Sequence, residues 1–213
     1  SQKITYLKND EFFFTNGKSK AISSGIVIDA DNFEYNKIKN IINAYGNVKI
    51  DNHDENYLIY TDEATYQKNK ELFITKGKSK AINEGIIIDA DNFEYNKSNN
   101  VINANGNVAI DNKDENYLIY ADDATYLKNE QLFLTKGHSK AINEDIVING
   151  DNFEYNRIDN TINAEGNVKI EDTLNDYLIF AKEAKYYKNS EKVITQGETK
   201  ADIQSKYYIT SKD

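Results

Sequence analysis

A glycine returns at nearly even steps along this chain of 213 residues, and no other feature constrains the fold as strongly. Seven of the ten glycines are spaced alternately by 29 and 31 residues, and a tyrosine stands eleven residues before each of them. The segment ADNFEYN at 30–36 returns at 90–96, with the variant GDNFEYN at 150–156, so the full period is 60 residues. A fixed period of this length is typical of repeat architectures, in which each unit packs on its neighbours. We therefore predict a single domain, 1–213, of about 3.5 such units, with half repeats centred on Gly17, Gly46, Gly77, Gly106, Gly137, Gly166 and Gly197.

The residues around these glycines alternate with period two. The pattern is Ile-x-Ala-x-Gly-x-Val-x-Ile at 42–50 and Phe-x-Thr-x-Gly-x-Ser-x-Ala at 73–81. Such alternation predicts a β-strand with one buried face, and an earlier apolar strand precedes each glycine strand. A glycine in mid-strand indicates a bend or a close backbone approach, although a simple turn glycine is the alternative. Two strands for each half repeat predict an all-β fold of about fourteen antiparallel strands, connected locally.

The earlier strand of each half repeat changes its parity partway. Within 26–35 the apolar positions are even at Ile28 and Ala30 but odd at Phe33 and Tyr35. Unless one residue is absorbed, this switch would turn half of the apolar set towards solvent. We therefore predict a β-bulge near Asp31, near Asp62 in the alternate half, and at their repeats.

Composition narrows the function. Sixteen Tyr and nine Phe supply ample apolar area for a core, whereas a net charge of −9 argues against a nucleic-acid partner. The absence of Cys excludes disulfides and thiolate metal sites. No apolar run is long enough for a membrane-spanning helix, and the N-terminus lacks a secretory leader, so an exported chain would have lost its leader.

Catalysis needs an asymmetric set of groups, yet nearly every polar residue here is repeated, so we expect no enzyme and no cofactor. Only His53 and His138 break the repeat, and both are interpreted as surface substitutions. The acidic turns 51–55 and 111–115 lack the glycine of calcium loops, so solvated turns are favoured over metal sites. An outward row of Lys76, Lys78, Lys80, Lys136 and Lys140 would either meet lipid phosphates or form a solvated face.

The repeated motif resembles a known family. The unit A-D-x-(F/A)-x-Y, a short Asn/Lys turn and a strand with A-x-G-N-V-x-I, as in 90–110, is similar to the OstA-like repeats of LptA and of the periplasmic N-terminal domain of LptD. The resemblance covers essentially the whole chain. It implies a twisted, V-shaped β-jellyroll with open edges, located in the periplasm either by itself or as the periplasmic domain of an outer-membrane protein.

The same resemblance implies a role in lipopolysaccharide transport, with acyl chains shielded in an apolar interior on their way to the outer membrane. The implied partners are lipopolysaccharide and other Lpt-type jellyrolls, or a second copy head to tail, joined through edge strands. The rival interpretation is a structural β-repeat, such as an adhesin stalk or surface fibre, whose interior is a dry packed core. The expected lipid-binding residues are Ile28, Ala30, Phe33, Tyr35, Ile42, Ala44, Val48, Ile50, Ile59, Ala64, Tyr66, Phe73, Ile88, Phe93, Tyr95, Ile102, Val108, Ile119, Tyr126, Phe133, Phe153 and Ile162.

Overall fold

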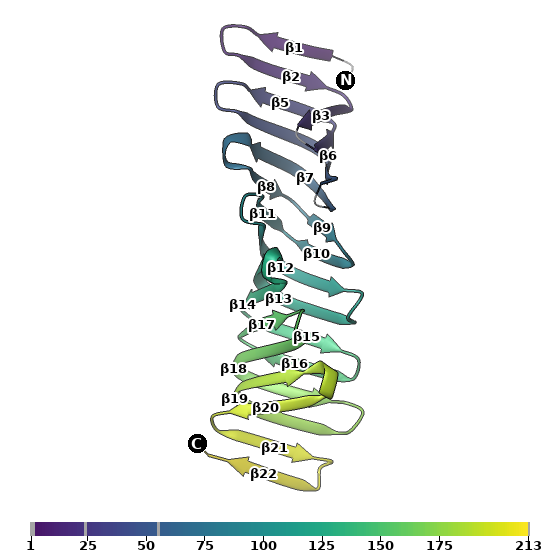
Figure 1. Cartoon of the computed structure of the whole chain (residues 1–213), viewed down its shortest axis with the longest axis vertical. Coiled ribbons are helices and arrows are strands. Elements are labelled where there is room, and N and C mark those ends of the chain that lie inside the picture. The colour runs from purple at the N-terminus through teal and green to yellow at the C-terminus, as the bar shows by residue number, and fades with distance from the viewer. Residues whose placement is uncertain (1–2, 24, 55, 213) are drawn as a thin grey trace. The chain divides into compact units, whose positions relative to one another are not determined.

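The computed structural model is all-β and describes residues 3–23, 25–54 and 56–212. Its 22 strands belong to one antiparallel sheet, in which each strand pairs with others that lie near it along the chain (Figure 1). The fold class predicted from the sequence is confirmed at this level. The chain divides into two compact units, Ser1–Asn105 and Gly106–Asp213. A single domain over 1–213 stays a prediction.

The first unit contains two long strands and nine short ones. They are β1 (Lys3–Leu7), β2 (Phe12–Asn16), β3 (Ser19–Ser23), β4 (Ile26–Ala30), β5 (Asn32–Asn36), β6 (Ile41–Asn52), β7 (Tyr57–Gln67), β8 (Leu72–Lys76), β9 (Ser79–Asn83), β10 (Ile86–Ala90) and β11 (Asn92–Asn96). A short 3₁₀ turn, η1 (Lys68–Lys70), follows β7. β12 (Val101–Asn112) contributes residues to both units.

The second unit repeats the same order of elements. Its strands are β13 (Tyr117–Leu127), β14 (Leu132–Lys136), β15 (Ser139–Asn143), β16 (Ile146–Gly150), β17 (Asn152–Asn156), β18 (Thr161–Asp172), β19 (Tyr177–Tyr187), β20 (Lys192–Gln196), β21 (Thr199–Ile203) and β22 (Tyr207–Ser211). The 3₁₀ turns η2 (Lys128–Glu130) and η3 (Lys188–Ser190) follow the long strands β13 and β19.

The strand count exceeds the predicted fourteen for a local reason. Seven of the predicted strands remain single, the other seven are each split in two, and β22 is a further strand. Asp31, for example, divides the predicted strand 26–35 into β4 and β5, which both pair with β6. Three of the splits lie opposite a bulge in the neighbouring strand, and four lie at a glycine of the split strand itself, as at Gly77 between β8 and β9.

The bulge lies one strand away from its predicted position. Along β6 and β7 the register shifts between Tyr45 and Val48, so that Gly46 and Asn47 together face Asp62. The extra residue is therefore in the glycine strand and not at the aspartate. The reason is conformational, because Gly46 has φ +74°, which glycine adopts far more readily than aspartate.

The bulges divide each unit into two layers. In the second unit, layer A comprises the 123–127 half of β13, β14, β17, the 161–165 half of β18, the 183–187 half of β19, and β20. Layer B comprises the 117–120 half of β13, β15, β16, the 168–172 half of β18, the 177–181 half of β19, β21 and β22. Because β18 and β19 run through both, the layers are two halves of one bent sheet. Their inward side chains form the core between them.

The outermost strands are exposed. All five residues of β1 and all five of β22 are exposed, and β22 carries Tyr207, Tyr208 and Ile209 at 66, 74 and 54% exposure. Within the described part of the chain, β1 pairs with β2 and β22 with β21, and each has one edge without a strand partner. Among the described residues, these two strands are therefore the edge strands of the sheet.

Candidate functional site

The expected lipid-binding residues point into the space between the layers. Twenty of the twenty-two are buried, with exposures from 0% for Ile162 to 7% for Tyr66. Tyr35 and Ile42, near the N-terminal end of the ladder, are partly exposed. These side chains point inward because apolar residues alternate along each strand, and because the bulge keeps them on the inward face where the parity of the alternation changes. That lipid contacts these residues stays a prediction.

Stacked aromatic rings fill the middle of each unit. The rings of Tyr126 and Phe133 are 4.1 Å apart and nearly parallel, and Tyr155 lies 6.0 Å from Phe133. Tyr66, Phe73 and Tyr95 repeat this stack in the first unit, with centroid distances of 4.1 and 6.1 Å. Because cores pack at the density of organic crystals, the closed part of the interior holds no lipid-sized space.

The two layers of the second unit also touch directly. The ring of Tyr117, at the start of β13 in layer B, lies 4.7 Å from that of Tyr155 in layer A. Asn112 donates from Nδ2 to the Tyr155 hydroxyl at 3.0 Å. In the first unit, Tyr57 and Tyr95 meet in the same way at 5.1 Å. Aromatic pairs of this geometry hold the layers together at mid-height.

Outside this contact, a group of side chains from both layers forms what we call the clasp, defined by Glu115, Asn160 and Lys188. Asn160 Nδ2 donates to Glu115 Oε2 at 2.9 Å, and Lys188 Nζ lies 3.7 Å from the same carboxylate oxygen. Lys188 also donates to the backbone carbonyl of Glu115 and lies 5.0 Å from the centroid of the Tyr117 ring. The Glu115 carboxylate, in a turn of layer B, thus contacts two turns of layer A, the one that contains Asn160 and the one that contains Lys188.

Near the C-terminal end of the second unit the interior opens into a cleft of about 410 Å³. The apolar side chains of its wall occupy inward positions of the next repeat. Tyr177 is the equivalent of Tyr117 60 residues later, but Tyr177 is 39% exposed whereas Tyr117 is 2% exposed. The volume is within the range of pockets that bind small ligands, and polar atoms contribute somewhat more of the lining surface than apolar atoms. The apolar lining is Ile146, Ile170, Leu174, Tyr177, Ile179, Tyr186 and Val193, and the charged rim is Glu144, Asp145, Asp172, Lys188 and Glu191.

Sequence reasoning placed Ile170, Ile179, Tyr186 and Val193 only implicitly, as equivalents of predicted residues at 60-residue steps, and it missed Ile146, Leu174 and Tyr177. Ile179 repeats Ile59 and Ile119, and Val193 stands where Phe73 and Phe133 occur earlier. The signal that marks the cleft is this loss of a phenyl ring. An apolar side chain with less bulk leaves the space between the layers less filled.

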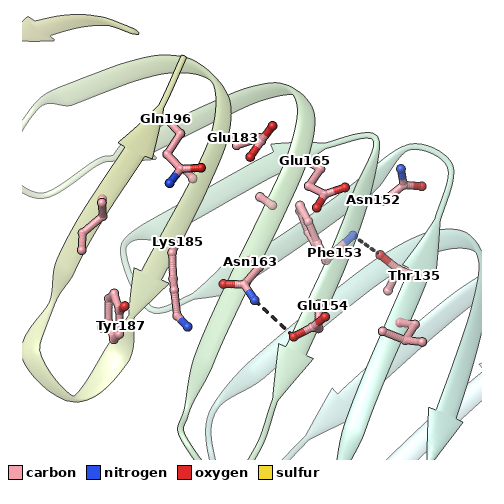
Figure 2. Close-up of a pocket in the computed structure, with 14 residues that line it drawn as sticks. Thr135, Asn152, Phe153, Glu154, Asn163, Glu165, Glu183, Lys185, Tyr187 and Gln196 are labelled. Atoms are coloured by element: carbon pink, nitrogen blue, oxygen red, sulfur yellow. Dashed lines mark hydrogen bonds between the residues drawn. The ribbon is translucent and has the colours of Figure 1, made fainter. Parts of the chain in front are cut away.

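A second, larger hollow lies on the outward side of layer A, with a volume of about 660 Å³ (Figure 2). Figure 2 shows Asn163 donating to Glu154 across neighbouring strands at 3.2 Å. Its walls also include Leu134 and Ile194, which are 37 and 41% exposed. Of the expected lipid-binding residues only Phe153 borders it. Polar and apolar atoms contribute about equally to this surface, which was not predicted from the sequence.

The two histidines lie on the surface. His138 is almost fully exposed, and its hydrogen bond with Asp122, 2.8 Å from Nδ1, raises the pKa of His138. His53 lies 3.3 Å from Asp51 in an exposed turn. Among the described residues no group of three or more His, Asp or Glu side chains is placed to hold a metal ion, and Glu55 of the first acidic turn lies outside those residues.

Across the described part of the chain, no helix has the length and apolarity needed to cross a bilayer. No family model and no curated protein matches the sequence. Among solved structures, the chain is similar to LptH of Pseudomonas aeruginosa, described as the LptA homologous periplasmic component of the lipopolysaccharide transport device. The identity is 14%, the match covers 66% of this chain and 82% of LptH, and the TM-score is 0.29. A likeness of this degree carries no argument about function, which has to come from the residues of this chain.

Proposed function

We propose that the chain is a periplasmic module that shields the acyl chains of lipopolysaccharide during transport to the outer membrane. The observation that carries the proposal is the cleft, where the apolar track between the layers opens beside a charged rim. Burying an acyl methylene between the layers gains about 0.8 kcal/mol, while a sugar head group stays in water at the rim. The OstA-like motif of the sequence supports the same role.

The repeat suits movement of such a lipid. Because each 60-residue step presents nearly the same side chains, affinity is similar at each step and no deep pocket holds the lipid in place. Net direction then has to come from an energy source outside this chain. Exposed edge strands such as β22 offer backbone groups through which other Lpt-type jellyrolls, or a second copy, would continue the track.

A structural stalk or fibre is the second candidate, and the closed middle of each unit favours it. Phe133, Tyr155 and Ile162 are all 0% exposed, and the clasp ties the layers over them. Under this alternative the cleft would bind no lipid. Under the transport proposal, the layers separate at the clasp when a chain passes.

Photo-crosslinking separates the two candidates. We expect a photoreactive residue at Ile179, inside the cleft, to form adducts with lipopolysaccharide, whereas one at Ile194, on the outward side of the adjacent strand, forms few. Gel mobility with immunodetection of the lipid measures the adducts. Equal labelling at both positions, or none at Ile179 in a folded protein, would favour the stalk.

The clasp gives a second prediction. Replacing Glu115 by alanine removes the acceptor shared by Asn160 and Lys188 and should lower the cost of separating the layers by about 1 kcal/mol, roughly a fivefold change in open population. We therefore expect several-fold more lipid adducts from a photoreactive residue at Phe133 in the Glu115→Ala background. Glu130→Ala, in the exposed turn η2, is the matched control. Unchanged labelling at Phe133 would show that the clasp does not gate the interior.

A further inference from the structure

A pair of polar residues recurs in every 60-residue unit, in layer B, on either side of the turn that joins the two long strands. Asn52 and Tyr57 face each other across the β6–β7 hairpin, and Asp172 and Tyr177 do so across β18–β19. Asn112 and Tyr117 occupy the same places in the repeat between them. These side chains point inward, because Asn52, Asn112 and Tyr117 are only 3, 0 and 2% exposed.

Several polar atoms of these pairs have no partner within the described part of the chain. They are Nδ2 and Oδ1 of Asn52, Oδ1 of Asn112, and the hydroxyl of Tyr117. Buried polar groups in native proteins are nearly always hydrogen-bonded, because an unmade bond forfeits the hydration that was lost on burial. The asparagine amide is left unsatisfied at the same position in two successive repeats, so the feature belongs to the repeat and not to one turn.

The chemistry of the unpaired atoms defines what would satisfy them. Burial, with a smaller contribution from Tyr155, raises the pKa of Tyr117 far above its ordinary value, so the hydroxyl keeps its proton and can donate. Oδ1 of Asn112 needs a donor, because the other half of that amide is already bonded to Tyr155. One secondary amide, with one N–H and one C=O, complements this pair.

The third pair borders the cleft and is reached from outside. Tyr177 is 39% exposed, whereas Asp172 accepts from the backbone N–H groups of Leu174 and Asn175 at 3.1 and 2.8 Å. Four strand spacings, about 19 Å, separate this pair from Asn112 and Tyr117. An amphiphile that enters the cleft would meet Tyr177 first and the buried pair one repeat later.

We propose that these pairs are hydrogen-bonding stations for the amide that joins an acyl chain to the head group of the transported amphiphile. The inference rests on the proposed function and specifies the ligand as N-acylated. The acyl chain lies along the apolar track, and its amide moves from one station to the next. A chain of the same length joined through an oxygen has no N–H for Asn112 Oδ1 and offers only a weak acceptor to the Tyr117 hydroxyl, so it would bind more weakly.

Two defined probes test the stations: N-dodecanoylglucosamine, which carries the amide, and dodecyl glucoside, which does not. For the wild-type chain we expect the amide probe to bind about tenfold more tightly in calorimetry. Tyr117→Phe should remove most of this preference and weaken the binding of dodecyl glucoside much less than that of the amide probe. Tyr120→Phe, at a tyrosine of the same strand that is 42% exposed, is the control and should keep the preference.

The thermal stability of the ligand-free variants gives an independent readout. Tyr117→Phe should melt at the same temperature as wild type or higher, since it removes an unpaired buried hydroxyl and keeps the ring. A clear fall would mean that bound water already satisfies the hydroxyl, and would overturn the proposal. Equal affinity of both probes would overturn it while leaving the proposed function intact, whereas failure of both probes to bind would remove the proposed function itself.

Discussion

Replacing Phe133 by alanine is expected to lower the free energy of unfolding of the second unit by about 3–5 kcal/mol. The side chain is fully buried between Tyr126 and Tyr155, whose ring centroids lie 4.1 and 6.0 Å away. Its removal leaves a cavity that neighbouring rings, fixed on separate strands, fill only in part. Urea unfolding followed by tyrosine fluorescence measures the loss.

The next residue along the strand supplies the control. Leu134 is on the outward side of β14 and is 37% exposed, so Leu134→Ala should cost about 1 kcal/mol or less. The comparison also bears on function. If the two variants are equally stable, the space around Phe133 is not a packed core, and a permanently open lipid channel becomes the better description.

The second large effect is expected at the bulge in β18. Gly166 has φ +74°, and a methyl group there would come within 2.2 Å of Oδ2 of Asp151. Asp151 cannot withdraw freely, because its backbone N–H donates to the carbonyls of Glu165 and Gly166, and Asn167 donates to its carboxylate at 3.0 Å. Gly166→Ala should therefore cost more than the 1–2 kcal/mol, roughly, of left-handed strain alone.

The double variant Gly166→Ala with Asp151→Ala separates the two contributions. Removing the carboxylate should recover the steric part of the loss, and the conformational part should persist. Chemical denaturation of the four proteins of this cycle gives the coupling energy. Additive losses would mean that Asp151 does not restrict which residue fits at position 166. The positive φ of Gly166 alone would then explain why glycine recurs at this position of each repeat.

The sequence predicted the β-structure, the period and the inward face because each depends on local alternation. Residues such as Ile28, Ile119 and Phe133 could be assigned to the interior from parity alone. The position of the bulge could not, since parity shows that a residue is absorbed but not which of two paired strands absorbs it. That choice depends on φ at Gly46, which only the paired strands reveal.

The closed middle and the clasp were beyond sequence reasoning for a different reason. Glu115 and Lys188 are 73 residues apart, and their contact depends on how sharply the sheet bends at each bulge. Periodicity specifies which side chains face inward, but not how closely the two layers approach. The unpaired atoms of Asn52 and Tyr117 are likewise visible only once burial and partners are known.

The regular match between bulge and aspartate has a consequence for how the length of this protein can change. In the first unit, the segment around Asp31 and that around Asp91 are identical over ten residues, 28–37 and 88–97, so recombination of the gene between them would delete 60 codons in frame. The joined chain would lose six strands, and the next bulge, at Gly106, would again follow its own aspartate. Each such event shortens the ladder by about 19 Å without a new fold having to be found. The reach of the molecule is thus adjustable by copy number, in whole repeats.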